Sequence, residues 1–207
     1  FHDNVQTIID KFSGSFEEVF QVGPPRLNVE IEKGMFSDLA LISPLSGLLL
    51  ITSIVFFLRT FSSAALPIAT SALSILWTFG FMGYAGIPLT LLTAIVPSLV
   101  IVIGSTEDTH LLSSYLGGLD PSKSKIRMAA IRFMAKHTGL PIFITGFTTT
   151  VGFLSNGISD IPLIQDFAYA SGFAMFANLI VTVLALPLLL SFIGPKVSKV
   201  TEEAMPT

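Results

Sequence analysis

The stretch PLTLLTAIVPSLVIVIGSTEDTHLLSSYL, residues 88–116, decides the fold of this chain. Its first part is apolar over the roughly 20 residues that a helix needs to cross the hydrocarbon core of a bilayer. Glu107, Asp108 and His110 then interrupt the apolar pattern, which resumes at Leu111 for two more turns. The stretch therefore predicts a membrane-spanning helix that carries ionisable side chains near one end.

The rest of the chain has the same apolar character. Hydrophobic residues make up 51% of the 207 residues and charged residues only 12%, whereas charged residues are about 25% of an average soluble domain. Apolar helices of this length need lipid to cover them. We therefore predict an all-α polytopic membrane protein, with five transmembrane helices in a bundle over residues 41–195. The expected spans are at about residues 42–58, 64–83, 88–116, 139–156 and 163–193.

A polar insert separates the third and fourth predicted spans. Asp120 and Pro121 are typical of the first turn of a helix. One face then carries apolar residues and a histidine at helical spacing: Ile126, Ala129, Ala130, Phe133, Met134 and His137. Basic residues take the other faces: Lys123, Lys125, Arg127, Arg132 and Lys136. The pattern predicts a basic amphipathic helix over 121–137 on the membrane surface, which we favour over a calmodulin-binding helix of the same pattern.

Residues 1–40 are the part of the chain with soluble character. Short alternation at residues 19–22 and 27–32, on either side of Gly23-Pro24-Pro25, predicts strands and a turn. We expect a short extracytoplasmic α/β segment that is the tail of a larger region, because so short a segment cannot form a core of its own. The chain opens at Phe1 with no pattern of a signal or transit peptide, which indicates a cut edge.

The basic residues predict an orientation, because Lys and Arg in short loops gather on the cytoplasmic side. If five spans alternate, one side of the membrane receives Arg59, Lys123, Lys125, Arg127, Arg132, Lys136, Lys196 and Lys199. The opposite short loops, 84–88 and 155–166, contain no Lys or Arg. We therefore expect the N-terminal segment outside, and the amphipathic helix and the tail 196–207 in the cytoplasm.

The depth of Glu107, Asp108 and His110 in the bilayer has two interpretations. At 1.5 Å per residue, Glu107 lies roughly 28 Å from Pro88, which would place it near the inner headgroups. The apolar pattern continues through Leu116, however, and tilted helices reach less depth per residue, so we favour a position in the inner half of the membrane. Ionisable groups inside a membrane are costly unless paired or hydrated, which makes these three residues candidates for function.

A carboxylate in such a setting can load and release a proton near neutral pH, as an ion-coupled transporter requires. His110 lies three residues from Glu107 and could share the proton, although it could equally be satisfied by a backbone carbonyl or by headgroups. Thr148 and Thr149, in the fourth span, lie at the depth expected for Asp108 and could hydrogen-bond its carboxylate. Hydrogen bonds to their own helix are at least as common. We predict a proton relay of Asp108, Glu107, His110, Thr148 and Thr149.

Composition argues against several other kinds of site. The chain has no cysteine, which excludes a disulfide or thiolate site within it. No second pair of His or Glu residues at ligand spacing is present to complete the coordination of a metal ion. The spans show no nucleophile paired with a base, as a catalytic site would need. The net charge of -3 does not indicate a nucleic-acid partner. We expect no enzyme activity, catalytic residue, metal or cofactor. Four glycines suit close packing between helices: Gly104, Gly146, Gly152 and Gly172.

Three motifs resemble the resistance-nodulation-division (RND) superfamily. They are SILWTFGFMG at 74–83, the proline-led third span ending IGSTEDTHLL at 103–112, and TTTVGFLS at 148–155, with the basic insert between the last two. The resemblance is to the lipid-exporter-like branch related to MMPL proteins and to the sterol-sensing segment of Patched-like proteins. It covers nearly the whole chain, as helices two to six of one transporter half. Phe167-Ala168 departs from the family pattern, in which a glycine often stands beside the phenylalanine.

The resemblance implies a proton-coupled exporter of hydrophobic or lipid-like molecules in a bacterial inner membrane. It assigns the proton relay to Asp108, four residues after Gly104, with Glu107, His110, Thr148 and Thr149 as further members. The expected partners are a second transporter half or other membrane subunits, together with membrane lipids. A non-transporting accessory or sterol-sensing-like module, which binds lipid and braces a larger complex, is the alternative.

Overall fold

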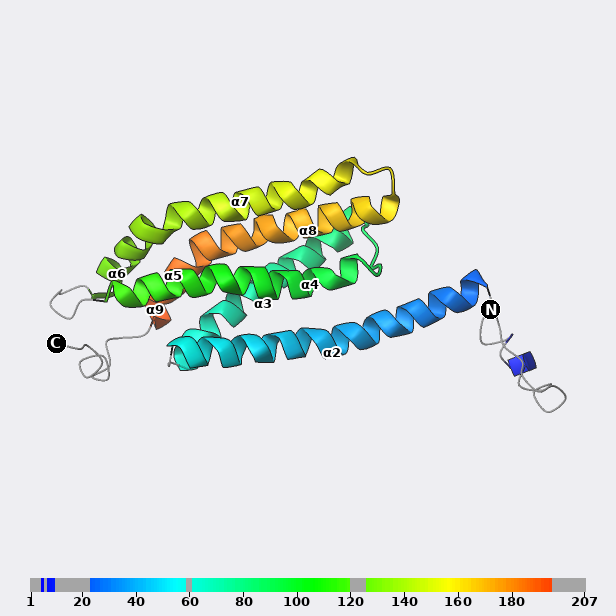
Figure 1. The fold of residues 1–207 in the computed structure, drawn as a ribbon, viewed down its shortest axis with the longest axis horizontal. Coiled ribbons are helices and arrows are strands. Elements are labelled where there is room, and N and C mark those ends of the chain that lie inside the picture. Colours follow the sequence, from blue (N-terminus) through cyan, green and yellow to red (C-terminus); the bar gives the residue numbers. More distant parts are fainter. Residues whose placement is uncertain (1–4, 6, 10–22, 59–60, 120–125, 195–207) are drawn as a thin grey trace. The chain divides into compact units, whose positions relative to one another are not determined.

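The computed structural model describes residues 5, 7–9, 23–58, 61–119 and 126–194. Their regular elements are all helices (Figure 1). The chain divides into two units, Phe1–Ile42 and Ser43–Thr207. Helix α2, Pro24–Leu58, begins in the first unit and ends in the second.

The strand predicted at residues 27–32 is wrong, because these residues belong to α2. Pro24 and Pro25 are the first residues of this helix, a position where proline is favoured because its missing N–H needs no partner. Arg26 and Glu30, one helical turn apart, form an ion pair of 2.5 Å. The Gly23-Pro24-Pro25 stretch, which predicted a turn, therefore marks the start of a helix. The alternation of residues 27–32 is too short to outweigh this helix signal. The strand predicted at 19–22 lies outside the described residues.

Four helical segments of the second unit are long and apolar enough to cross a membrane: Ala65–Ala85, Thr93–Gly117, Ile126–Ile158 and Pro162–Ile193. They overlap the predicted second to fifth spans. The predicted first span, 42–58, lies within α2, where the described apolar stretch Ala40–Leu49 is shorter than a crossing. The described part of the chain thus has four candidate spans, and the fifth crossing remains a prediction.

Most of these segments are built from several helical pieces. The second unit contains α3 (Phe61–Ala85), the 3-10 turn η1 (Thr93–Ile95), α4 (Val96–Leu99), the π-helix η2 (Val100–Gly104), α5 (Ser105–Gly117), α6 (Ile126–Met134), the π-helix η3 (Ala135–Gly139), α7 (Leu140–Ser155), the 3-10 turn η4 (Asn156–Ile158), α8 (Pro162–Ile180), the π-helix η5 (Val181–Ala185) and α9 (Leu186–Ile193). Pro141 and Pro187 follow two of the π-helices by two residues. A proline cannot bond the carbonyl four residues earlier and crowds it, which accounts for the widened turns before them.

The predicted amphipathic helix at 121–137 corresponds in part to α6, since residues 120–125 are outside the described part of the chain. Ala130 and Met134 are buried, while Arg132 is exposed. Figure 1 shows that α6 meets α7 at a bend, with η3 joining them and no loop between. A position on the membrane surface remains a prediction.

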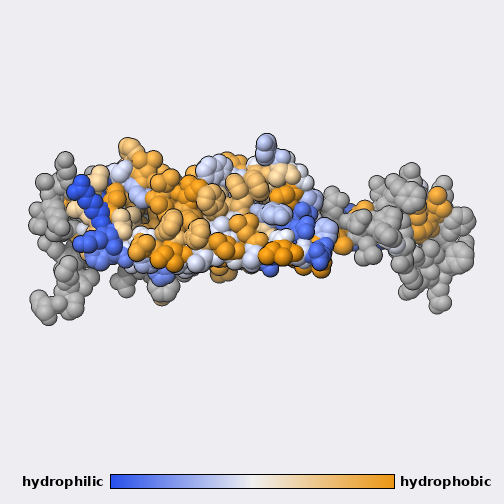
Figure 2. Space-filling model, turned by 90° about the horizontal axis from the view of Figure 1, so that it is seen from above, coloured by the Kyte–Doolittle hydropathy of each residue, from blue (hydrophilic) through white to orange (hydrophobic). Residues whose placement is uncertain are grey.

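Helix α8 lies at the centre of the second unit, packed against α7 and α3 (Figure 1). Small residues make this close packing possible, because Ala168, Ala170, Ala174 and Ala177 are all buried on α8. Large apolar side chains face outward instead, among them Leu76, Phe143, Ile144, Phe147, Leu184 and Phe192. Figure 2 shows one such face, where hydrophobic residues cover most of the surface and hydrophilic ones gather toward its ends. This distribution is that of helices surrounded by lipid.

The interior has two apolar clusters with a polar layer between them. The first contains Leu66, Leu111, Leu112, Tyr115, Ala130, Met134, Ile142, Leu186 and Leu190. The second contains Met82, Val96, Val100, Ala170, Ala174 and Met175. On α3, on Thr93–Gly117 and on Pro162–Ile193, most of the buried polar residues fall between the members of the two clusters: Thr70, Ser71, Ser74, Thr78, Ser105, Glu107, Asp108, Asn178 and Thr182. Among the described residues, the buried charged side chains thus lie in one internal layer.

Candidate functional site

Asp108 lies at the centre of the polar layer and is fully buried, at 0% exposure. Thr70 of α3 donates a hydrogen bond from its hydroxyl to Asp108 Oδ2. Thr182 of η5 donates from its hydroxyl to Asp108 Oδ1 over 2.8 Å. Both carboxylate oxygens therefore accept from hydroxyl groups on different helices.

Glu107, 6% exposed, occupies the neighbouring position in the layer. The side-chain amide of Asn178 donates from Nδ2 to Glu107 Oε2 over 3.1 Å. The amide oxygen of Asn178 accepts a longer bond of 3.4 Å from the hydroxyl of Ser74. Through these bonds α3, α5 and α8 share one polar network. Within the described residues no Lys, Arg or His forms an ion pair with either carboxylate.

Gly104 makes room for this network. A Cβ at Gly104 would overlap the side chain of Asn178, so only glycine lets the amide reach Glu107 from this direction. A Cβ at Gly146 would lie 2.8 Å from Leu179 Cδ1, and one at Gly172 would overlap Leu154. At Gly152 an added Cβ meets nothing within 4 Å, so the structure gives this glycine no close packing partner among the described residues.

The predicted relay residues fall into two groups. Asp108 and Glu107 lie in the polar layer, and His110, on the same helix, is exposed. Thr148 and Thr149 do not reach the layer: their hydroxyls donate to carbonyls of their own helix, Thr148 to Ile144 over 2.9 Å and Thr149 to Thr145 over 2.8 Å. The arrangement is the alternative that the sequence left open for these two threonines.

The three partners of the carboxylates, Thr70, Asn178 and Thr182, were not predicted, and neither was Ser74, which bonds Asn178. A signal was present, because polar residues recur every four positions on otherwise apolar helices. Thr70, Ser74 and Thr78 share one face of α3, and Asn178 and Thr182 share one face of the last span. Polar stripes of this kind mark the sides of two helices that turn toward a common polar group.

A groove lined mainly by residues with polar side chains lies beside Glu107, with a volume of about 560 Å³. Its walls are formed by α5 on one side and by η3 and α7 on the other. The lining residues are Thr106, Glu107, His110, Ser113, Ser114, Thr138, Pro141, Ile142 and Thr145. Glu107 thus borders the groove, whereas Asp108 does not line it.

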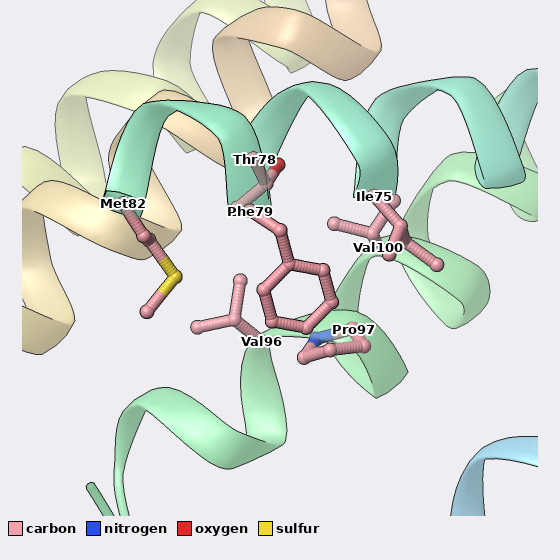
Figure 3. Close-up of a pocket in the computed structure, with 7 residues that line it drawn as sticks. All are labelled: Ile75, Thr78, Phe79, Met82, Val96, Pro97 and Val100. Carbon is pink, nitrogen blue, oxygen red and sulfur yellow. The ribbon is translucent and has the colours of Figure 1, made fainter. Parts of the chain in front are cut away.

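An apolar crevice lies between α3 and the helical pieces α4 and η2 (Figure 3). The residues that line it are Ile75, Thr78, Phe79, Met82, Val96, Pro97 and Val100. Figure 3 shows the ring of Phe79 reaching from α3 toward Val96 and Pro97. Phe79 is 38% exposed, so the crevice opens at the surface of the bundle.

Comparison with known proteins matches the part of the chain that holds this site. Residues 59–203 match the sterol-sensing domain of SREBP cleavage-activation. A protein of Methanocaldococcus jannaschii that is named as a membrane protein is 24% identical over 173 residues, which cover 84% of this chain and 44% of that protein. The chain thus spans less than half the length of this curated relative. Because the matched residues hold all four candidate spans and the whole polar layer, the chain is a membrane module that belongs to the sterol-sensing domain family.

Proposed function

We propose that this chain forms the membrane part of one half of an RND-type, proton-coupled exporter of hydrophobic or lipid-like molecules. Sterol-sensing domains are a feature of RND- and MMPL-related membrane proteins, which supports the proposal. A second half or other membrane subunits complete the transporter, and its site is the inner membrane of a bacterium. The observation that carries the proposal is the burial of Asp108, at 0% exposure, among apolar helices without a cation beside it in the described residues.

Such a carboxyl group suits reversible protonation. A charge buried without a counter-ion is costly, whereas a neutral acid with hydrogen-bond partners is far less so. Glu107 sits next to Asp108 and is also buried, which adds repulsion between the two when both are ionised. When one of the two carboxylates binds a proton, the layer holds one buried charge fewer and the repulsion between Glu107 and Asp108 is removed. The polar layer can therefore hold or release a proton while the surrounding helices stay in lipid.

Thr70 provides a way for α3 to respond to that proton. An ionised carboxylate only accepts hydrogen bonds, whereas a protonated one also donates. The Thr70 hydroxyl has other acceptors within reach, the carbonyls of Leu66 at 3.1 Å and Pro67 at 3.0 Å. When Asp108 Oδ2 takes up a proton, Thr70 turns its hydroxyl to its own helix and accepts from the acid. Proton loading thus reverses a bond between α3 and α5.

The test is the substitution Asp108→Asn in the full-length transporter, reconstituted into vesicles with an imposed pH gradient. Asn keeps the shape of the side chain but cannot carry the proton. We expect export driven by the gradient to fall to background. Asp160→Asn is the matched control, since it removes a carboxylate from the exposed connection before α8, and it should leave export unchanged. Export that survives Asp108→Asn would remove the relay from the account.

The second candidate is a sterol- or lipid-binding module without transport, which the matched family and the crevice of Figure 3 favour. The crevice holds no open volume of its own, so a ring system or an acyl chain from the bilayer would contact its mostly apolar lining at the bundle surface, where Phe79 is exposed. The test is cross-linking with a photoreactive sterol in vesicles, followed by mapping of the modified residues. Cross-links concentrated around Phe79 and Pro97, together with insensitivity to Asp108→Asn, would favour this function over export.

A further inference from the structure

Most residues that line the groove between α5 and α7 have polar side chains, on candidate spans that are otherwise suited to lipid. Seven of its nine lining residues are hydroxyl-bearing, acidic or histidine: Thr106, Glu107, His110, Ser113, Ser114, Thr138 and Thr145. Elsewhere on the same candidate spans apolar side chains are exposed, as at Val102 and Ile144. Lipid chains offer no hydrogen bonds, so the ionisable groups of this lining, Glu107 and His110, are stable only against water or polar protein groups.

The size and chemistry of the groove fit water. A volume of about 560 Å³ holds more than ten water molecules at about 30 Å³ each. The hydroxyl of Thr106 donates to the carbonyl of Val102 over 2.8 Å, and that of Thr145 donates to Pro141 over 2.9 Å. Their donors are thus used within the helices, while their oxygens remain able to accept from water.

The groove reaches only one of the two carboxylates. Glu107 forms part of its lining, while Asp108 lies behind, bonded to Thr70 and Thr182 and fully buried. On α3, Thr93–Gly117 and Pro162–Ile193, one apolar cluster lies on each side of the polar layer along the helix and separates it from the helix ends. Glu107 is therefore the junction between a place open to water and the sealed acid.

The groove also has a direction along the helix. On α5 its lining runs from Thr106 to Ser114, eight residues, or roughly 12 Å at 1.5 Å per residue, toward the end of α5 at Gly117. On the other wall it includes Thr138 of η3, next to the end that carries the basic residues of α6. By the distribution of Lys and Arg, this end is the cytoplasmic one.

We propose that the groove is a water-filled vestibule that connects the cytoplasmic side to Glu107, so that Glu107 exchanges protons with water and Asp108 exchanges them through Glu107. The part played by Asp108 rests on the proposed function, whereas the vestibule itself is a property of the groove. Among the described residues, the titratable groups that face it are Glu107 and His110, both on α5; α7 and η3 contribute hydroxyl and apolar groups.

The absence of cysteine from these 207 residues allows a direct test. Single variants Ser114→Cys and Thr145→Cys place a thiol on opposite walls of the groove, and Ser113→Cys is a third position should one variant fail to fold. Leu184→Cys is the control, because Leu184 is 67% exposed among outward apolar residues of the last span. Each is made in the full-length protein with any other cysteine replaced, and is treated with a membrane-impermeant cationic methanethiosulfonate in sealed vesicles of either orientation.

These reagents attack the thiolate, which forms in water and not in lipid. We expect the groove thiols to react at least about tenfold faster than Leu184→Cys, and only from the cytoplasmic face. Groove thiols no more reactive than the control would overturn the proposal, including the case in which a partner helix fills the groove. Reaction only from the opposite face, or equally from both, would overturn it as well.

This outcome is separable from that of the proposed function, because thiol reactivity needs no transport. Unreactive groove thiols together with export abolished by Asp108→Asn would remove the vestibule and keep the relay. Reactive thiols together with export that survives Asp108→Asn would keep the water path and remove proton coupling through Asp108.

Discussion

Thr182 donates a 2.8 Å hydrogen bond to Asp108, although 74 positions of sequence separate the two residues. The bond joins the last candidate span, Pro162–Ile193, to the second, Thr93–Gly117, in the layer between the two apolar clusters. Thr182 belongs to the π-helix η5, and Asp108 lies in the first turn after the π-helix η2. Single π-turns within α-helices are frequent at functional sites; here one ends four residues before the buried acid and another carries its partner Thr182.

The substitution Thr182→Val tests how much the hydrogen bond from Thr182 to Asp108 contributes to stability. Valine has the shape of threonine without the hydroxyl, so it leaves Asp108 Oδ1 without its donor. We expect a loss of about 1–3 kcal/mol in the free energy of unfolding, the cost of an unsatisfied buried polar group. Equilibrium unfolding in mixed micelles measures it. Thr148→Val, where the hydroxyl bonds its own helix at an exposed position, is the control and should change stability by less than about 0.5 kcal/mol.

Gly104→Ala tests the close approach of Asn178. The added methyl group would overlap the amide that bonds Glu107, so the helices must separate or Asn178 must leave its position. Overpacking of this kind costs typically about 1–3 kcal/mol. Gly152→Ala is the matched control, because its methyl group meets nothing within 4 Å. Alanine there should be neutral or stabilising by up to about 1 kcal/mol, its advantage over glycine in a helix. Equal effects at the two sites would contradict this packing.

The substitution Asn178→Asp tests whether the polar layer tolerates a third acidic side chain. The change replaces the amide donor beside Glu107 with a third acidic group, while Asp108 lies next to it. An uncompensated buried charge costs several kcal/mol, so we expect a loss of more than about 3 kcal/mol at neutral pH. Asn156→Asp, at an exposed position in η4, is chemically identical and should cost little. A mild effect at Asn178 would mean that the layer is wetter than its burial indicates.

The candidate spans were predictable because each depends on a local run of residues. Apolar length alone located four of them, and Pro162–Ile193, which contains the most hydrophobic stretch of the four, is the plainest case. The first span differs, since α2 continues from polar residues into the apolar stretch and no boundary marks where lipid begins. At its other end, the alternation of residues 27–32 indicated a strand, but the proline pair before it starts a helix.

The acidic residues of the site were predictable, whereas their partners were not. Glu107 and Asp108 stand out because ionisable residues are rare in apolar helices. Thr70 and Asn178 contact them across 38 and 71 positions of sequence, which no local pattern encodes. Equal distance from the helix ends pointed to Thr148 instead. Distance from the helix end gives the depth of a residue in the membrane but not the side of the helix on which it lies. Thr148 lies on an exposed side of α7, away from the polar layer.

The most direct measurement of the central claim is infrared difference spectroscopy of the full-length protein, titrated from alkaline to acid pH in lipid. A protonated carboxyl group buried in an apolar setting has a carbonyl stretch of its own, apart from ionised carboxylates. If Asp108 carries the proton, this band rises with acid in the wild-type protein and in Asp160→Asn, and is lost in Asp108→Asn. A band that persists unchanged in Asp108→Asn would contradict the account.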